Sequence, residues 1–218
     1  MSVASALDLT SGAAVAQATP VVFVVDDDVS VRESLELLIR DAGWLPETFE
    51  CAQDFLARPR ALIPSCLILD IALPGLNGLE LQKRIADRPD MPIIFITGAG
   101  DVPTTVQAMK AGAVEFLTKP FNDSVLLSAI QLAITRSEAR LRVDAEIDSL
   151  RARYATLSRR EREVMGLVVR GLLNKQVGFE LGISEITVKA HRGRMMQKMN
   201  ASSLADLVNI AAKLGIAR

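Results

Sequence analysis

Apolar and polar residues alternate in blocks along the first two thirds of the chain. Short runs with strand character recur at 21–25, 44–49, 66–69, 93–96 and 115–117, and each is followed by apolar residues at helical spacing. Strands that alternate with helices in this way predict a parallel sheet covered on both faces. Because crossover connections are right-handed, we expect a doubly wound α/β sheet of five strands.

The pattern changes after residue 134. Neither proline nor glycine follows as far as Leu150, and mostly charged residues with a thin apolar line predict a helical linker that continues the last helix. Four short helical segments come next. Their expected N-caps are Ser158, Asn174, Ser184 and either Ser202 or Ser203. A tight, glycine-containing turn at 182–183 joins the second and third segments, which favours helix-turn-helix DNA binding.

The distribution of charge separates the same two parts of the chain. Residues 1–149 carry 12 Lys and Arg against 21 Asp and Glu, a net charge of −9, and residues 150–218 carry 13 against 5, a net charge of +8. This asymmetry favours an acidic domain suited to a metal or a basic partner and a basic domain suited to nucleic acid. A solvated basic face would give the same charge, so charge alone leaves both interpretations open.

Composition excludes several other classes of protein. No segment approaches about 18 uninterrupted apolar residues, and the first 19 positions lack a basic start, so we expect a cytoplasmic protein without a membrane partner. Those 19 residues are rich in Ala, Ser and Thr and predict a flexible tail. Cys51 and Cys66 lack metal-ligand spacing, and the single histidine leaves no partner for a His-based metal site.

The candidate chemistry of the acidic part begins at Asp70, where an apolar run ends and a Pro/Gly-rich loop follows. Taken alone, this segment fits a reactive carboxylate and a turn cap equally well. The run Asp26-Asp27-Asp28 follows the first strand, and the carboxyl ends of parallel strands meet at one edge of a sheet. Clustered carboxylates repel unless a cation neutralises them, and an all-oxygen site with room for water suits Mg²⁺.

Two further polar residues stand at the ends of the remaining strands. Thr97 closes the run that contains Ile96, and Lys119 precedes Pro120. A hydroxyl and an ammonium here could meet oxygens of a phosphoryl group on Asp70 while a metal meets a third. Separately, Thr97 could be a helix cap and Lys119 a solvated surface residue, but together with the acidic cluster they favour a phosphoryl site.

These residues recur in order as a known set of motifs. The set is Val25-Asp26-Asp27-Asp28, Leu69-Asp70 with Pro74 and Gly78, Thr97, and Lys119-Pro120. It resembles the receiver domain of two-component response regulators over residues 20–138, which implies the flavodoxin-like strand order. The runs 96–103 and 108–113 are similar to the FixJ branch in particular.

The resemblance implies a role for each carboxylate. Asp70 would be the phosphoacceptor, with a sensor histidine kinase as the donor. Asp27 would bind Mg²⁺ directly together with Asp70, and Asp26 would act mainly through water. The backbone carbonyl of Ala72 would complete the protein ligands, whereas Asp28 is no firm ligand in the family.

The resemblance also implies a switch. Thr97 and Lys119 would contact the phosphoryl group, and Phe116 would occupy the aromatic switch position of the family. Because a phosphoryl group adds about one to two negative charges, it can draw in the Thr97 loop and open a space for Phe116. The face formed by the fourth helix, fifth strand and fifth helix of the family would then support a homodimer on phosphorylation.

The basic part of the chain has a resemblance of its own. The runs 157–163, 174–175, 183–184 and 187–191, with Gly171, resemble the LuxR-type helix-turn-helix over residues 155–218. On a helical wheel, the helix from Ser184 to Met199 turns Val188, Met195 and Met199 to the core. The candidate residues for contacts with promoter DNA are Thr187, Lys189, Ala190, His191 and Arg194.

Three hypotheses follow for the whole protein. The first is a FixJ-like transcription regulator, not an enzyme on outside substrates, that phosphorylation of Asp70 switches and that acts through RNA polymerase. The second is a phosphohydrolase that uses Asp26, because 26–30 loosely fits an Asp-x-Asp pattern. The third is a constitutive DNA-binding protein with a structural receiver. The predicted domains are a tail at 1–19, a receiver at 20–138, a helical linker at 139–154 and a DNA-binding domain at 155–218.

Overall fold

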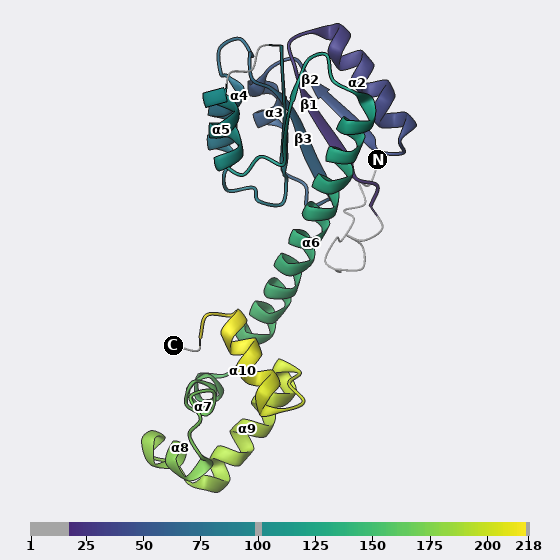
Figure 1. Cartoon of the computed structure of the whole chain (residues 1–218). Coiled ribbons are helices and arrows are strands. Elements are labelled where there is room, and N and C mark those ends of the chain that lie inside the picture. The colour runs from purple at the N-terminus through teal and green to yellow at the C-terminus, as the bar shows by residue number, and fades with distance from the viewer. Residues whose placement is uncertain (1–17, 99–101, 217–218) are drawn as a thin grey trace, which may run out of the picture. The chain divides into compact units, whose positions relative to one another are not determined.

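The computed structural model describes residues 18–98 and 102–216 (Figure 1). The predicted flexible tail lies almost wholly outside the described residues. The chain divides into two compact units, Met1–Val143 and Asp144–Arg218, and each is described here by itself. One 33-residue helix, α6 (Asp123–Ala155), contains residues of both units and runs through the predicted linker without interruption.

The first unit contains a parallel sheet of five strands. They are β1 (Val21–Val25), β2 (Leu45–Phe49), β3 (Ser65–Asp70), β4 (Ile93–Thr97) and β5 (Glu115–Thr118). Their order is β2-β1-β3-β4-β5, and every neighbouring pair is parallel. This order reverses direction beside β1, as in flavodoxin-like sheets, and the predicted doubly wound α/β fold is confirmed.

Helices cover both faces of the sheet (Figure 1). α3 (Ala52–Ala57), α4 (Gly78–Arg84) and α5 (Val102–Lys110) cover one face, and α2 (Val29–Asp41) and α6 cover the other. Successive side chains of a strand point to opposite faces, so Leu67 and Leu69 of β3 enter one core and Cys66 and Ile68 the other. All six residues of β3 are buried. We therefore expect truncation of a β3 leucine to alanine to cost about 2–5 kcal/mol.

The two cysteines differ in their surroundings. Cys66 is fully buried in the centre of β3, and burial raises the pKa of its thiol far above the usual range, so the thiol stays protonated. Cys51 is half-buried and forms the N-cap position of α3. Both are free thiols.

The second unit is helical around a small core of its own. Its further helices are α7 (Arg159–Val168), α8 (Asn174–Leu181), α9 (Glu185–Met199) and α10 (Leu204–Lys213). The predicted core residues Val188, Met195 and Met199 of α9 are fully buried with Val164 of α7 and Leu207 of α10. Ser158, Ser184 and Ser203 cap α7, α9 and α10, which confirms those predicted N-caps.

One predicted cap is wrong. Asn174 is the first helical residue of α8, and the N-cap position is Leu173, whose backbone N–H donates to Oε1 of Gln176 at 2.8 Å. The Asn174 side chain instead accepts a hydrogen bond from the guanidinium of Arg192 in α9, at 3.0 Å. A tertiary contact has therefore taken the carbonyl oxygen that could have capped the helix.

The helices of the described residues include none that combines the length and the apolar character needed to cross a bilayer.

Candidate functional site

Four polar side chains meet at one edge of the sheet because each stands where a parallel strand ends. Asp70 and Thr97 are the last residues of β3 and β4. Val25 is in register with Leu69, so Asp26, which follows it, lies beside Asp70. Lys119 follows β5, and its backbone N–H donates to the carbonyl of Thr97 at 2.7 Å. The sheet register thus brings together residues up to 93 positions apart.

The Lys119 ammonium bridges two carboxylates. Its Nζ lies 2.6 Å from Oδ2 of Asp26 and 2.7 Å from Oδ2 of Asp70. Asp26 is fully buried, Asp70 is 4% exposed, and the Lys119 side chain retains 21% exposure. Such buried carboxylates require a nearby cation, because an unpaired charge removed from water costs several kcal/mol.

The pKa values in this cluster follow from burial and charge. Burial raises the pKa of Asp26, and the hydrogen bonds from Lys119 and the Asp28 backbone offset this only in part. For Lys119, burial acts to lower the pKa, but the hydrogen bonds and charges of Asp26 and Asp70 outweigh it and raise the pKa. The ammonium of Lys119 is therefore held firmly in its charged form.

A third carboxylate completes an all-oxygen cluster. One ligand oxygen each from Asp26, Asp27 and Asp70 lies within 4.8 Å of the others, and Asp27 is exposed to solvent. Mg²⁺ prefers oxygen ligands and keeps several waters, so a carboxylate cluster with one solvent-facing side fits this ion. The backbone N–H of Ala72 donates to Oδ1 of Asp70 at 2.9 Å and fixes the remaining oxygen of that carboxylate.

Backbone groups hold the acidic residues in place. Asp28 caps α2 by accepting a hydrogen bond from the Ser30 N–H at 2.8 Å, and its own N–H donates to Oδ1 of Asp26 at 2.9 Å. Gly78 lies so close to β3 that an added Cβ would stand 2.5 Å from the carbonyl oxygen of Asp70. The glycine therefore allows α4 to begin directly against the backbone of Asp70.

One contact in this cluster has no signal in the sequence. The Arg32 guanidinium donates to the backbone carbonyl of Asp26 at 2.7 Å, six residues earlier in the chain. Arginine on the exposed side of a predicted helix is ordinary, and only the turn from β1 into α2 directs it to the carbonyl.

The proposed switch residues lie on β4 and β5. Thr97 is almost fully buried, and Phe116 is half-buried with its ring centroid 6.5 Å from that of Phe95. The Phe116 ring packs against the core formed by α3, α4 and α5. Residues 99–101 of the adjoining loop lie outside the described part of the chain.

The second unit presents an exposed surface along α9. Four candidates, Thr187, Lys189, Ala190 and Arg194, are exposed. Lys189 forms an ion pair with Glu185 at 3.1 Å, and both side chains are about half exposed. The fifth candidate, His191, is half-buried, and its buried Nδ1 has no hydrogen-bond partner among the described residues.

The turn before α9 depends on a close helix approach. An added Cβ at Gly178 of α8 would lie 2.7 Å from the carbonyl oxygen of Ile183. The N–H of Ile183 donates to the Gly178 carbonyl at 3.0 Å, and α8 ends at Gly182 with a φ of 65°. Glycine at 178 thus lets the turn pack directly on α8, as a helix-turn-helix requires.

An ion pair between exposed Lys198 and buried Glu161 fastens the far end of α9 to α7. Lys198 Nζ lies 2.7 Å from Oε2 of Glu161 and donates to the Thr156 carbonyl at 3.1 Å. Glu161 also completes a capping box with Ser158. The hydrogen bond from Lys198, with that from the Ser158 backbone, holds the pKa of Glu161 below its usual range.

Comparison with known proteins extends these observations to a family. Residues 22–131 match the model of the response regulator receiver domain, and residues 155–217 match that of the LuxR family of bacterial regulatory proteins. The chain belongs to the NarL/FixJ family of response regulators. The predicted resemblance to both domains is therefore confirmed.

Individual relatives of this response regulator match along nearly its whole length. It is 49% identical to nodulation protein W of Bradyrhizobium diazoefficiens, over 90% of this chain and 87% of that protein. It is 42% identical to the transcriptional regulatory protein FixJ of the same organism, over 89% of this chain and 96% of that protein. The sequence is 49% identical to that of response regulator StyR, whose solved structure matches this one with a TM-score of 0.80. The match covers 90% of this chain and 100% of the StyR chain.

These relatives support the predicted function at the level of the family. A receiver domain joined to a LuxR-type domain makes the protein a DNA-binding two-component response regulator. A sensor kinase and DNA are the partners that this pair of domains implies.

Proposed function

We propose that Asp70 is the phosphoacceptor of this response regulator and that its phosphorylation switches DNA binding. The observation that carries the proposal is the bridge from Lys119 to Asp70 and Asp26, with Asp27 beside it. A phosphoryl group on Asp70 would enter a site where an ammonium already lies 2.7 Å from the carboxylate. Such preorganised charge stabilises transferring phosphoryl groups.

The transfer step balances with a phosphohistidine of the sensor kinase as donor. An oxygen of Asp70 attacks phosphorus, an O–P bond forms while the N–P bond breaks, and the leaving imidazole nitrogen takes up a proton from water. Lys119 then pairs with an oxygen of the new phosphoryl group, since its Nζ already contacts the Asp70 carboxylate. Beyond this transfer and the later hydrolysis, in which water takes the phosphoryl group and releases inorganic phosphate, we assign no enzymatic activity to the chain.

A magnesium ion fits the carboxylate cluster. Asp27 and Asp70 would be its direct carboxylate ligands, the Ala72 carbonyl a third ligand, and Asp26 a partner through water. When bound, the ion offsets negative charge on the phosphoryl oxygens. The three carboxylates and Lys119 carry a net charge of about −2 when all are ionised, which a divalent cation balances.

The switch would run from Asp70 through Thr97 and Phe116 to a surface for a second copy of the chain. That surface comprises α5, β5 and the first part of α6. It exposes Val106 and Met109 of α5 and Val125 of α6, each more than 40% exposed. Apolar side chains on one face favour association, so the phosphorylated form would be a homodimer that binds promoter DNA and recruits RNA polymerase.

Contacts with DNA would come from α9. Lys189 and Arg194 would meet phosphates or guanines, Thr187 and Ala190 would face the groove, and His191 would contact the backbone. The N-terminal half of a second helix is the usual reading element of a helix-turn-helix.

Mass mapping tests the phosphoacceptor directly. The full chain is treated with acetyl phosphate and Mg²⁺, digested, and searched for a phosphoryl adduct, which we expect on the peptide that contains Asp70. An adduct on the peptide that contains Asp26 would instead support a phosphohydrolase. No adduct in a protein that still binds promoter DNA would support a constitutive regulator.

A further inference from the structure

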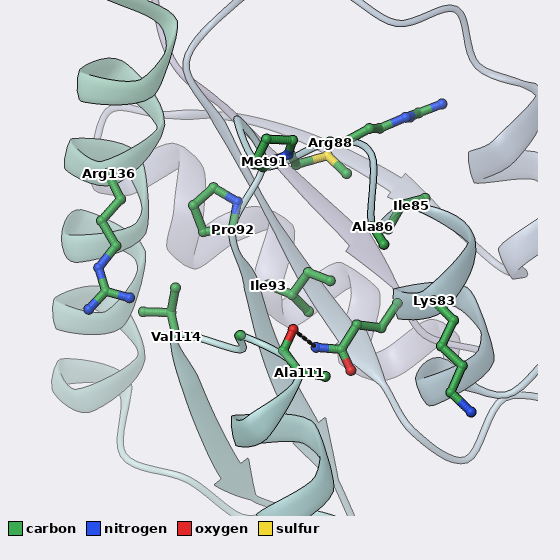
Figure 2. Close-up of a pocket in the computed structure, with 13 residues that line it drawn as sticks. Lys83, Ile85, Ala86, Arg88, Met91, Pro92, Ile93, Ala111, Val114 and Arg136 are labelled. Carbon is green, nitrogen blue, oxygen red and sulfur yellow. Dashed lines mark hydrogen bonds between the residues drawn. The ribbon is translucent and has the colours of Figure 1, made fainter. Parts of the chain in front are cut away.

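A cleft lies at the opposite edge of the sheet from Asp70. It has a volume of about 410 Å³, and its lining comes from the end of α4, the residues after α5, the start of β4 and α6 (Figure 2). Ile93, which begins β4, lines the cleft, whereas Thr97, which ends β4, lies at the carboxylate cluster. The two sites are thus about 13 Å apart along one strand, and the volume is that of a small-molecule site.

The lining carries charge of one sign only. Among its thirteen residues are Lys83, Arg88 and Arg136 and no carboxylate, although the surrounding unit is acidic. In Figure 2, Arg136 extends along α6 beside Val114 on one side of the cleft, and Lys83 and Arg88 lie on the other side with their charged ends turned outward to solvent. Within the described residues, these three cations form no ion pair.

Two acidic residues close in sequence to this lining do not line the cleft. Asp90 is buried and paired with Arg60, and Asp87 is exposed but does not line the cleft. The carboxylate cluster lies about 13 Å away along β4, and the Lys119 ammonium there offsets part of its negative charge. The charged side chains that line the cleft itself are all cationic, which favours an anionic ligand.

The floor of the cleft is apolar and held by hydrogen bonds. Ile85, Met91, Ile93 and Val114 supply the floor, with prolines 89 and 92 beside them. The N–H of Val114 donates to the Ile93 carbonyl at 2.7 Å. Buried Gln82 donates to the carbonyls of Ala108 and Ala111, both at 3.3 Å, and ties α4 to the end of α5. The dashed line in Figure 2 marks the bond to Ala111. The shape is thus present before any ligand binds.

We propose that this cleft binds a small organic anion with an apolar body, of the carboxylate class. The apolar part packs on Met91, Ile93 and Val114, and the carboxylate pairs with Arg136 and with Lys83 or Arg88 at the rim. Arginine suits this role because its planar guanidinium meets a carboxylate through two hydrogen bonds. The site is independent of Asp70 and does not rest on the proposed phosphorylation.

Methyl NMR of the full chain tests the proposal. Protein labelled with ¹³C at the methionine methyl groups is titrated with 4-phenylbutanoate and, separately, with the uncharged 4-phenylbutan-1-ol. Met91 is the methionine that lines the cleft, and Met91→Leu assigns its signal. We expect a saturable shift of the Met91 signal with the carboxylate and binding by the alcohol that is weaker by about fivefold or more.

Charge variants provide matched controls. Arg136→Gln should weaken binding of the carboxylate by about fivefold, and Lys83→Gln by about two- to threefold. Arg84→Gln removes the same charge from the next position of α4, which does not line the cleft, and should change affinity by less than about twofold. Absence of a saturable shift, equal binding of acid and alcohol, or equal effects of the Lys83 and Arg84 variants would each overturn the proposal.

Discussion

The two units place their charged residues in opposite ways. In the first, Asp26 and Asp70 are withdrawn from water, and both accept hydrogen bonds from the half-buried Lys119. In the second, Lys189 and Arg194 stand in solvent on α9. Buried charges interact strongly but tolerate little change, whereas exposed charges each contribute little and act by their number. A switch that must register one phosphoryl group suits the first arrangement, and a surface that meets a polyanion suits the second.

The largest expected effect is in the buried site. Asp70→Asn keeps the shape of the side chain but removes the attacking carboxylate, so phosphate-dependent dimerisation should be abolished while the fold stays intact. Sedimentation of the full chain, with and without acetyl phosphate and Mg²⁺, measures this. Asp54→Asn changes an exposed carboxylate of α3 and should behave as the wild type. If the Asp70 variant dimerised and bound promoter DNA like the phosphorylated wild type, the proposed switch would be wrong.

The second unit also contains a buried charged residue, Glu161, so the contrast between buried and exposed charges is not complete. Glu161→Ala removes the partner of Lys198 and half of the capping box, and should destabilise this unit by about 2 kcal/mol. Its melting temperature should then fall by about 10 °C. Calorimetry of the full chain measures the change, with Glu180→Gln on the exposed side of α8 as the control. A loss no larger than that of the control would mean that the pair contributes nothing.

The same glutamate predicts a dependence on pH. Its folded pKa lies below the unfolded value of 4.5, so its stabilising contribution is present above about pH 4.5 and is lost as the pH falls through the folded pKa. Wild-type protein should therefore lose more stability between about pH 5 and pH 3 than Glu161→Gln does. Denaturant unfolding at several pH values compares them, and parallel curves would count against the lowered pKa.

An effect of similar size is expected at the close-approach glycine of each unit. Gly78→Ala and Gly178→Ala both drive a Cβ against a backbone carbonyl, and each should cost about 1–3 kcal/mol. The first should slow phosphorylation and the second should weaken DNA binding, so the two losses should separate by unit. Gly166→Ala in α7 meets open space and should instead stabilise its helix by up to about 1 kcal/mol. Identical effects on both activities would contradict this separation.

The smallest effect is expected on the exposed surface. Lys189→Ala should weaken binding to all DNA sequences by about three- to tenfold and lower the salt slope by about 1. Fluorescence anisotropy across a range of salt measures both, and Lys213→Ala, which removes a cation from α10, serves as the control. A loss confined to one base position would mean direct readout by Lys189.

How much of this structure the sequence could predict depends on how far apart in the chain the interacting residues lie. The apolar run that ends at Asp70 located β3 to within one residue at each end, because burial on both faces requires such a run. Spacing also identified Ser158 as the N-cap of α7. Local spacing could not reveal the ion pair of Glu161 with Lys198, 37 residues away. Nor could it reveal that Arg192 donates a hydrogen bond to the Asn174 side chain. Those contacts depend on tertiary packing that no local pattern encodes.

The burial of Cys66 has a practical consequence for studying the switch. Thiol reagents attack the thiolate, so a protonated thiol sealed inside β3 does not react while the fold persists. Cys51, the only other cysteine, therefore gives the native chain a single addressable position for a fluorophore or spin label. It stands two residues after Phe49, whose carbonyl accepts a hydrogen bond from the Asp26 N–H. The protein thus carries a natural attachment point for an optical reporter beside its acidic cluster.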